Sequence, residues 1–213
     1  MDNVADIRKE YMQHSLSEHE VSANPFHQFG LWWQEAIDAQ IDEVNAMTLA
    51  TASAAGVPSA RIVLLKGYDE QGFVFYTNYE SFKGQELAEN PRACLVFFWK
   101  ELERQIRITG IVGKVSAAES DDYFNSRPAG SRLGAWVSPQ STVIPGREWL
   151  TEREAALNKK FEGRAPERPP HWGGYRVKPV CFEYWQGRPS RLHDRIQYIL
   201  DDAGNWKRER LAP

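Results

Sequence analysis

Three short stretches of the sequence bring together charged and polar side chains that could form a functional site, one of them for a phosphate. The first is an apolar run that begins at Arg61 and ends at Lys66. The second offers a phenol, a guanidinium and a hydroxyl within nine residues, at Tyr123, Arg127 and Ser131. Charged donors form stronger hydrogen bonds to phosphate oxygens than neutral donors do, so the second stretch could surround one phosphate.

The third stretch is a charged connection between two apolar strands, and it contains His193 between Arg191 and Arg195. Trp185 lies shortly before it, at the end of the first of these strands. The other four histidines have neither metal-ligand spacing nor an evident partner, so no metal site is predicted.

Each stretch also has an ordinary structural explanation. Cations at the ends of an apolar strand commonly extend along the surface to reach solvent. A helix end capped by Ser and Arg produces the second pattern, and a solvated turn produces the third. The residue pattern alone therefore leaves both interpretations open for each stretch.

The composition excludes several functional classes. The chain has 213 residues and a formal net charge of −3, which provides no overall field for a nucleic acid. No window approaches the ~18 apolar residues of a membrane span, and the N-terminus lacks a basic and apolar leader. Cys94 and Cys181 have apolar neighbours and are predicted to be buried thiols. We expect a soluble, cytoplasmic protein that binds neither nucleic acid nor membrane.

Hydrophobic periodicity predicts mainly strands, with helices at intervals. Helices are expected over residues 25–40, 81–90, 117–126, 131–137 and 147–161. Strands are expected over residues 47–52, 61–66, 73–77, 93–99, 105–115, 180–186, 195–200 and 206–211. Residues 162–172 carry three prolines and are expected to form a loop. Strands at both ends of the chain favour a sheet closed into a small barrel with helices outside it.

The domain organisation follows from a change in composition near residue 25. Residues 1–24 are polar with alternating charge, and we expect a mobile arm that orders only against another surface. Residues 25–213 are expected to form a single domain.

Several ordered motifs, spread over nearly the whole chain, identify a family. The most specific are residues 61–66 (RIVLLK), 75–78 (FYTN), 102–105 (LERQ), 134–138 (GAWVS), 172–177 (WGGYRV), 185–187 (WQG) and 191–195 (RLHDR). With these motifs the chain resembles the pyridoxamine 5′-phosphate oxidase family. The resemblance implies an α+β fold, the FMN-binding split β-barrel, in which antiparallel strands form a Greek-key barrel with flanking helices. It also implies a homodimer with FMN between the subunits.

The resemblance also implies a set of cofactor-binding residues. Arg61 and Lys83 would hold the FMN phosphate, Gln140 and Ser141 would reach the cofactor from the partner subunit, and Trp185 would contact the flavin. The full set implied is Arg61, Ile62, Val63, Leu64, Leu65, Lys66, Tyr76, Thr77, Lys83, Gln105, Gln140, Ser141, Trp185 and Arg195.

A second implied set binds the substrate. It comprises Arg8, Tyr11, Lys66, Tyr123, Arg127, Ser131, Arg191 and His193. Arg191 and His193 would be the catalytic pair, holding the pyridine ring over the flavin from the other subunit. Arg8 and Tyr11 would belong to a lid that closes over the substrate. The activity implied is oxidation of pyridoxamine and pyridoxine 5′-phosphates to pyridoxal 5′-phosphate, with dioxygen as acceptor and hydrogen peroxide as product.

Two other functions are compatible with the same fold. One is a flavoprotein with a different substrate, and the other is a non-catalytic protein that binds flavin or pyridoxal phosphate for storage or sensing. One departure from the family pattern bears on the cofactor: Phe82 stands beside Lys83 where many relatives carry a second basic residue. The FMN phosphate is therefore expected to have one cation fewer.

Overall fold

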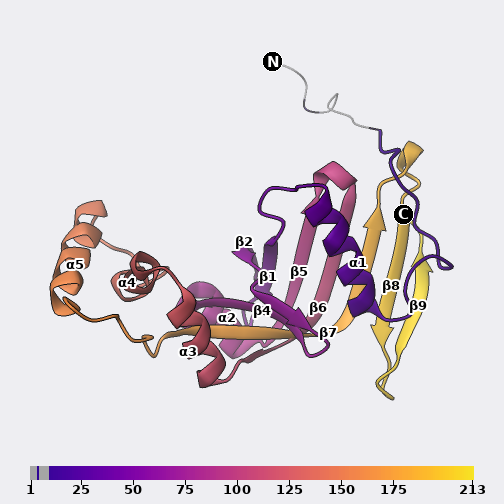
Figure 1. Ribbon diagram of the computed structural model, residues 1–213. Coiled ribbons are helices and arrows are strands. Elements are labelled where there is room, and N and C mark those ends of the chain that lie inside the picture. The colour runs from indigo at the N-terminus through magenta and orange to yellow at the C-terminus, as the bar shows by residue number, and fades with distance from the viewer. Residues whose placement is uncertain (1–3, 5–9) are drawn as a thin grey trace.

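The computed structural model describes residue 4 and residues 10–213. Its centre is a curled antiparallel sheet of nine strands, with helices packed around it (Figure 1). The strands are β1 (Ala46–Ala52), β2 (Pro58–Leu64), β3 (Gly67–Asp69), β4 (Gly72–Asn78), β5 (Arg92–Trp99), β6 (Arg104–Lys114), β7 (Trp172–Gln186), β8 (Asp194–Leu200) and β9 (Trp206–Leu211). The helices are α1 (Pro25–Asp38), α2 (Phe82–Glu89), α3 (Ala117–Ser126), α4 (Ala129–Val137) and α5 (Arg147–Lys160).

The strand order explains how the sheet closes. Hydrogen bonds connect the strands in the order β2-β1-β5-β6-β7-β4-β3, with β8 beside β7 and β9 beside β8. The first and last strands of that path, β2 and β3, are consecutive in the sequence, and the Lys66 N–H between them donates to the Val74 carbonyl over 2.8 Å. The predicted fold class, a mainly β barrel with flanking helices, is confirmed.

The core is aromatic, and α1 supplies much of it. Asn24 caps the helix by accepting from the N–H of Phe26 over 2.8 Å, and Pro25 occupies its first position. Phe29 and Trp32 are buried on the apolar face that the helical spacing predicted. The Phe29 ring meets that of Phe73, on β4, edge to face at a centroid distance of 4.8 Å.

Strand β7 is longer than the sequence predicted. The expected strand over residues 180–186 begins at Trp172, immediately after the proline-rich segment. Glycine is required in this first part, because a Cβ atom on Gly173 would overlap the hydroxyl of Tyr79. The pairing with β6 contains a β-bulge, in which Thr109 is opposite Cys181 and Gly110 is opposite Pro179.

Other expectations about the elements need small corrections. Helix α4 begins two residues earlier than predicted, and the strand predicted over residues 61–66 is β2, which begins at Pro58 and ends before Lys66. The cysteines, predicted to be buried, are half-buried thiols on the outer face of the sheet. Both lie opposite Thr109 on β6, and the Thr109 side chain is exposed, so directly opposite residues share this outer face.

Residues 10–24 lie along the C-terminal strands. Leu16 and Val21 are buried, and the Tyr198 hydroxyl donates to the Ser22 carbonyl over 2.6 Å. Arg210 forms an ion pair with Glu18 at 2.6 Å. Residues 16–22 of the N-terminal segment are therefore in contact with β8 and β9.

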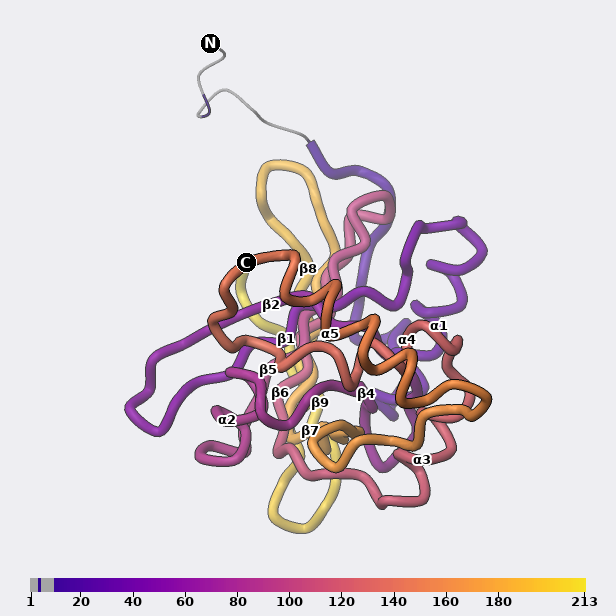
Figure 2. The backbone as a smooth tube through the Cα atoms, turned by 90° about the vertical axis from the view of Figure 1, so that its left-hand side faces the viewer, coloured from indigo at the N-terminus to yellow at the C-terminus, as the bar shows by residue number. Residues whose placement is uncertain are grey.

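Helices α4 and α5 lie at the opposite end of the molecule from β8 and β9 (Figure 1), and Figure 2 looks along this direction with α4 and α5 toward the viewer. Helix α5 has no buried residue, so most of its surface is open. Among the described residues, none of the helices combines the length and the apolar character that crossing a bilayer requires.

Candidate functional site

A cleft of about 680 Å³ lies where β2, β4, α2, α3 and α4 meet. Its lining includes nine of the predicted site residues that carry polar groups: Arg61, Lys66, Tyr76, Thr77, Lys83, Tyr123, Arg127, Ser131 and Gln140. Of the apolar predicted residues, Ile62, Val63 and Leu64 also line it. Four of the lining residues in the described chain are cations and none is Asp or Glu. This donor set is suited to anionic groups such as phosphates.

Helix α2 and strand β4 position one group of donors in the cleft. Ser81 caps α2, and this places Lys83 in the first turn of the helix. The Lys83 ammonium donates to Gln140 Oε1 over 2.8 Å and to the Thr77 hydroxyl over 3.2 Å. Burial lowers the pKa of Lys83, and the nearby charge of Arg61 lowers it further. An anion beside these two cations would relieve their mutual repulsion.

Aromatic rings form another wall of the cleft. The Tyr76 and Tyr123 rings stack at a centroid distance of 3.9 Å, and Trp172 lies parallel to Tyr76 at 5.6 Å. The Arg127 guanidinium lies over the Trp172 ring at 4.5 Å. Burial raises the pKa of Tyr76 to about 12, so this phenol keeps its proton and can donate it to an acceptor.

Arg127 has capacity left to bind an anion. Its Nη1 atom is buried and has no hydrogen-bond partner within the described residues. Burial also lowers the pKa of this guanidinium, because its charge is partly removed from water. A buried charged donor without a partner is costly, and a phosphate oxygen would satisfy it.

Trp172 was not assigned to the site from the sequence, although its motif was recognised. Its signal in the sequence was its place in the motif of residues 172–177, because the sequence predicted it to end the proline-rich loop and the strand to begin only at residue 180. Only the folded chain reveals that it stacks with Tyr76 and underlies Arg127.

A second group of predicted residues gathers at the far end of β7, and we call Tyr11, Trp185 and His193 the ring corner. The Trp185 and His193 rings are 4.6 Å apart, and Tyr11 contacts both, at 5.7 and 5.9 Å. Gly187 makes room for this arrangement, because a Cβ atom there would lie 2.7 Å from the Tyr11 side chain.

The protonation state of His193 follows from its contacts. The backbone N–H of Arg188 donates to His193 Nδ1 over 3.1 Å, so the neutral ring carries its hydrogen on Nε2. Burial lowers the pKa of His193 below 6.5, and the charge of Arg191 adds to this effect. Arg191 itself has φ = 60°, a left-handed conformation that is uncommon for a residue other than glycine.

Replacing Arg191 with alanine is expected to raise the pKa of His193 toward its ordinary value, because the neighbouring positive charge is removed. In the native chain, the contribution of this histidine to stability is complete above pH ~6.5 and is lost as the pH falls through the lowered folded-state pKa. Nuclear magnetic resonance titration of the His193 ring measures the change. Identical titration curves for the two proteins would contradict the assigned charge effect.

Three further predicted residues form a row beside the ring corner. Gln105 on β6 pairs with Trp185 on β7, which pairs with Arg195 on β8. Arg195 Nε donates to the buried carboxylate of Glu183 over 2.9 Å. The row lies on the outer face of the sheet, away from the core.

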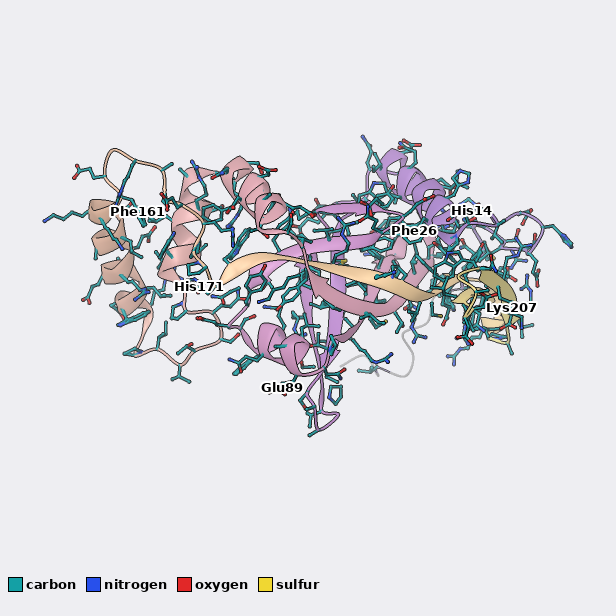
Figure 3. The ribbon with its side chains drawn as sticks, turned by 90° about the horizontal axis from the view of Figure 1, so that it is seen from below. His14, Phe26, Glu89, Phe161, His171 and Lys207 are labelled. Carbon is teal, nitrogen blue, oxygen red and sulfur yellow. The ribbon has the colours of Figure 1, made fainter. Side chains whose placement is uncertain are left out.

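The cleft and the ring corner lie far apart within one chain. Trp172 lines the cleft at the start of β7 and Trp185 belongs to the corner near its end, which is about 40 Å away at ~3.3 Å per residue. In Figure 3, His171, just before β7, lies toward the opposite end of the molecule from His14, whose carbonyl accepts from Arg188 just after β7.

The structure therefore divides the predicted site residues into two sets. Gln140, expected to act from the partner subunit, lies in the cleft of its own chain beside Lys83, while Ser141 is exposed and does not line the cleft. Leu65 is buried and also lies outside the lining. Arg8 falls outside the described residues.

Comparison with known protein families gives two matches. Residues 33–155 match the family described as pyridoxamine 5′-phosphate oxidase. Residues 172–213 match the pyridoxine 5′-phosphate oxidase C-terminal dimerisation region. A pyridoxine/pyridoxamine 5′-phosphate oxidase from Polynucleobacter asymbioticus is 60% identical over 213 residues, covering 100% of both chains. One from Bordetella pertussis is 58% identical and covers 99% of this chain and 100% of its own.

Solved structures support the same relationship. PhzG from Burkholderia lata, in complex with tetrahydrophenazine-1-carboxylic acid, is 31% identical with a TM-score of 0.88, covering 95% of this chain and 99% of its own. An FMN-binding protein from Nostoc punctiforme, related to pyridoxamine 5′-phosphate oxidase, is 18% identical with a TM-score of 0.71, covering 91% and 100%. The second likeness concerns the fold alone. Together with the full-length relatives, these findings show that the chain belongs to the pyridoxamine 5′-phosphate oxidase family.

Proposed function

We propose that this chain is an FMN-dependent oxidase that converts pyridoxamine 5′-phosphate and pyridoxine 5′-phosphate to pyridoxal 5′-phosphate. Dioxygen would be the acceptor and hydrogen peroxide a product with both substrates, and the amine would also consume water and release ammonia. The observation that carries the proposal is the cleft, because its four cations suit phosphate groups. One of them, Arg127, has a buried Nη1 atom without a hydrogen-bond acceptor among the described residues. Membership of the family supports the choice of substrate.

The donors of the cleft fit two phosphate-bearing molecules. Arg61 and Lys83, with the hydroxyl of Thr77, would hold the FMN phosphate. Lys66, Tyr123, Arg127 and Ser131 would hold the substrate phosphate. Each charge-assisted hydrogen bond is worth about 1.5–3 kcal/mol, and several are needed before a doubly charged phosphate leaves water.

A homodimer would bring the two sets of residues together. The ring corner cannot reach the cleft of its own chain, so the corner of a second copy would have to close each cleft. The match of residues 172–213 to a dimerisation region supports this assembly, because these residues include Trp185, Arg191, His193 and Arg195. The arm that carries Tyr11 would then cover the partner's substrate.

The residues of this chain would act mainly by binding and positioning. FMN, when bound, supplies the acceptor for the two electrons removed at the C4′ carbon. Arg191 would hold one face of the pyridine ring, and His193 would donate from Nε2 to a ring substituent. Holding the ring in one orientation makes the reaction with FMN effectively unimolecular and so lowers the entropic part of its barrier. A cation such as Arg195 near the flavin would favour its reduced, more negative form.

A related flavoenzyme with another substrate is the alternative that a specific finding favours. The PhzG structure holds a tetrahydrophenazine carboxylic acid, so proteins of closely similar fold bind different ring compounds. That ligand carries a carboxylate in place of a phosphate. The four cations of the cleft favour the phosphorylated substrate over it.

Peroxide release from the purified protein tests the proposed function. Addition of pyridoxine 5′-phosphate under air to the FMN-loaded protein is expected to give peroxide continuously and in excess over enzyme. A storage or sensing protein would release none. Turnover of a phenazine precursor with no turnover of either vitamer phosphate would identify the related flavoenzyme instead.

A further inference from the structure

Arg61 is already engaged by its own chain. Its Nη1 atom donates to the Leu49 carbonyl over 3.3 Å and also to the Thr51 hydroxyl. Its Nη2 atom donates to the Ser59 hydroxyl and to Glu86 Oε2, the latter over 3.2 Å. The four terminal hydrogens thus have acceptors, and Nε alone has no partner among the described residues. A phosphate that binds the Nη1 or Nη2 atom of Arg61 must therefore compete with these acceptors.

Glu86 is the charged member of this group. Its carboxylate accepts from the Ser59 hydroxyl over 2.6 Å and from the Thr51 hydroxyl over 2.5 Å, in addition to Arg61. The Arg61 and Glu86 side chains are 21% and 18% exposed, so water screens their attraction only in part. Burial acts to raise the pKa of Glu86, but the hydrogen bonds from Ser59, Thr51 and Arg61 outweigh it and the pKa is lowered. Glu86 is therefore ionised at neutral pH.

The charge around the proposed FMN phosphate is consequently small. Glu86 does not line the cleft, yet it offsets Arg61, which leaves Lys83 as the cation in this group without a paired carboxylate among the described residues. The adjacent position on α2 holds Phe82, which is 64% exposed and adds no charge. A carboxylate therefore lies against one of the two cations that are expected to bind the FMN phosphate.

We propose that Glu86 sets the affinity for the FMN phosphate by holding and partly neutralising Arg61. This inference rests on the proposed function, because it takes Arg61 as a ligand of that phosphate. Glu86 is a positioning residue, since it acts through Arg61 and does not touch the cofactor. The carboxylate makes the cofactor easier to release than the cations alone would allow.

Titration of the FMN-free protein with FMN and with riboflavin tests the proposal. Riboflavin has the same ring system and no phosphate, so it reports contacts to the ring alone. Glu86→Gln retains the shape and an oxygen acceptor for the two hydroxyls but removes the charge. We expect the Kd of FMN to fall about tenfold in this variant and the Kd of riboflavin to stay the same.

The matched control is Glu89→Gln, which removes the same charge from the exposed end of α2, outside the cleft (Figure 3 labels Glu89). It is expected to leave both dissociation constants unchanged. If Glu86→Gln fails to fold, Glu86→Ala replaces it, with a smaller decrease in the Kd of FMN because the hydroxyls lose their acceptor.

Three results would overturn the inference. An unchanged or higher Kd of FMN in the Glu86 variant would show that the carboxylate does not oppose the phosphate, and an equal gain for riboflavin would show that the effect lies elsewhere. If either result is found and the native protein still binds FMN, the proposed function is unaffected. A native protein that binds no FMN overturns the proposed function and this inference with it.

Discussion

Replacing Arg61 with alanine is expected to weaken FMN binding about 100-fold, because the positive charge and its charge-assisted hydrogen bonding to the phosphate, together worth about 3 kcal/mol, are lost. The variant also leaves the Glu86 carboxylate without its cationic partner, close to the proposed phosphate position. The negative charge of Glu86, no longer offset by Arg61, adds repulsion of the phosphate to the lost attraction. Fluorescence titration of the FMN-free protein measures the dissociation constant directly.

Arg92→Ala is the control for this experiment, because Arg92 is exposed on β5 and does not line the cleft. It should bind FMN as the native chain does. Riboflavin binding should be little affected in either variant. If Arg61→Ala kept a full complement of FMN through dilution and gel filtration, Arg61 would not be a ligand of the phosphate.

Arg127→Ala is expected to raise the KM for pyridoxine 5′-phosphate about 100-fold and to leave the Kd of FMN unchanged. The guanidinium lies over Trp172 with a buried Nη1 that has no partner among the described residues, so its loss removes a donor prepared for an anion. Losing about two charge-assisted bonds accounts for this factor. Steady-state peroxide assays of the FMN-loaded variant give KM and kcat separately.

The unphosphorylated alcohol, pyridoxine, provides the internal comparison for this variant. Without a phosphate to bind, it should be a poor substrate of both proteins, with little difference between them. Loss of FMN from Arg127→Ala would contradict the division of the cleft into two phosphate sites. An unchanged KM for the phosphorylated substrate would contradict the role of Arg127.

Much of the architecture could be predicted from local patterns in the sequence. Helix α1 has a strong apolar face, and residues 116–119 have the Ser-x-x-Glu pattern of a capped helix start, in which Ser116 accepts from the Glu119 N–H over 3.0 Å. The site residues in the cleft were predicted from the resemblance, because their motifs are short and specific. The contacts within the folded chain then explain why Lys83 and Gln140 lie together.

Other features depend on contacts between distant segments, which local patterns do not contain. The first half of β7 includes Gly173, Gly174 and Pro179, residue types that usually weaken a strand. They are accommodated because β4 and β6 pair on either side and neighbouring side chains fill the space. Glu86 was missed for a similar reason. A glutamate on a short helix resembles an ordinary surface residue until the fold brings Arg61 against it.

Val180 is the extra residue of the β-bulge in β7. It is the residue without an opposite on β6, and the odd-numbered Val177 faces the core before it whereas the even-numbered Tyr184 does so after it. Side chains of a strand alternate between its faces, so a single inserted residue exchanges inside and outside for everything that follows. The β-bulge absorbs this extra residue, because in a regular strand that included Val180 the odd-numbered side chains would stay inward, with Trp185 in the core and Tyr184 outside. The bulge thus lets a continuous strand bury aromatic rings from both of its halves and still present the Trp185 indole outward.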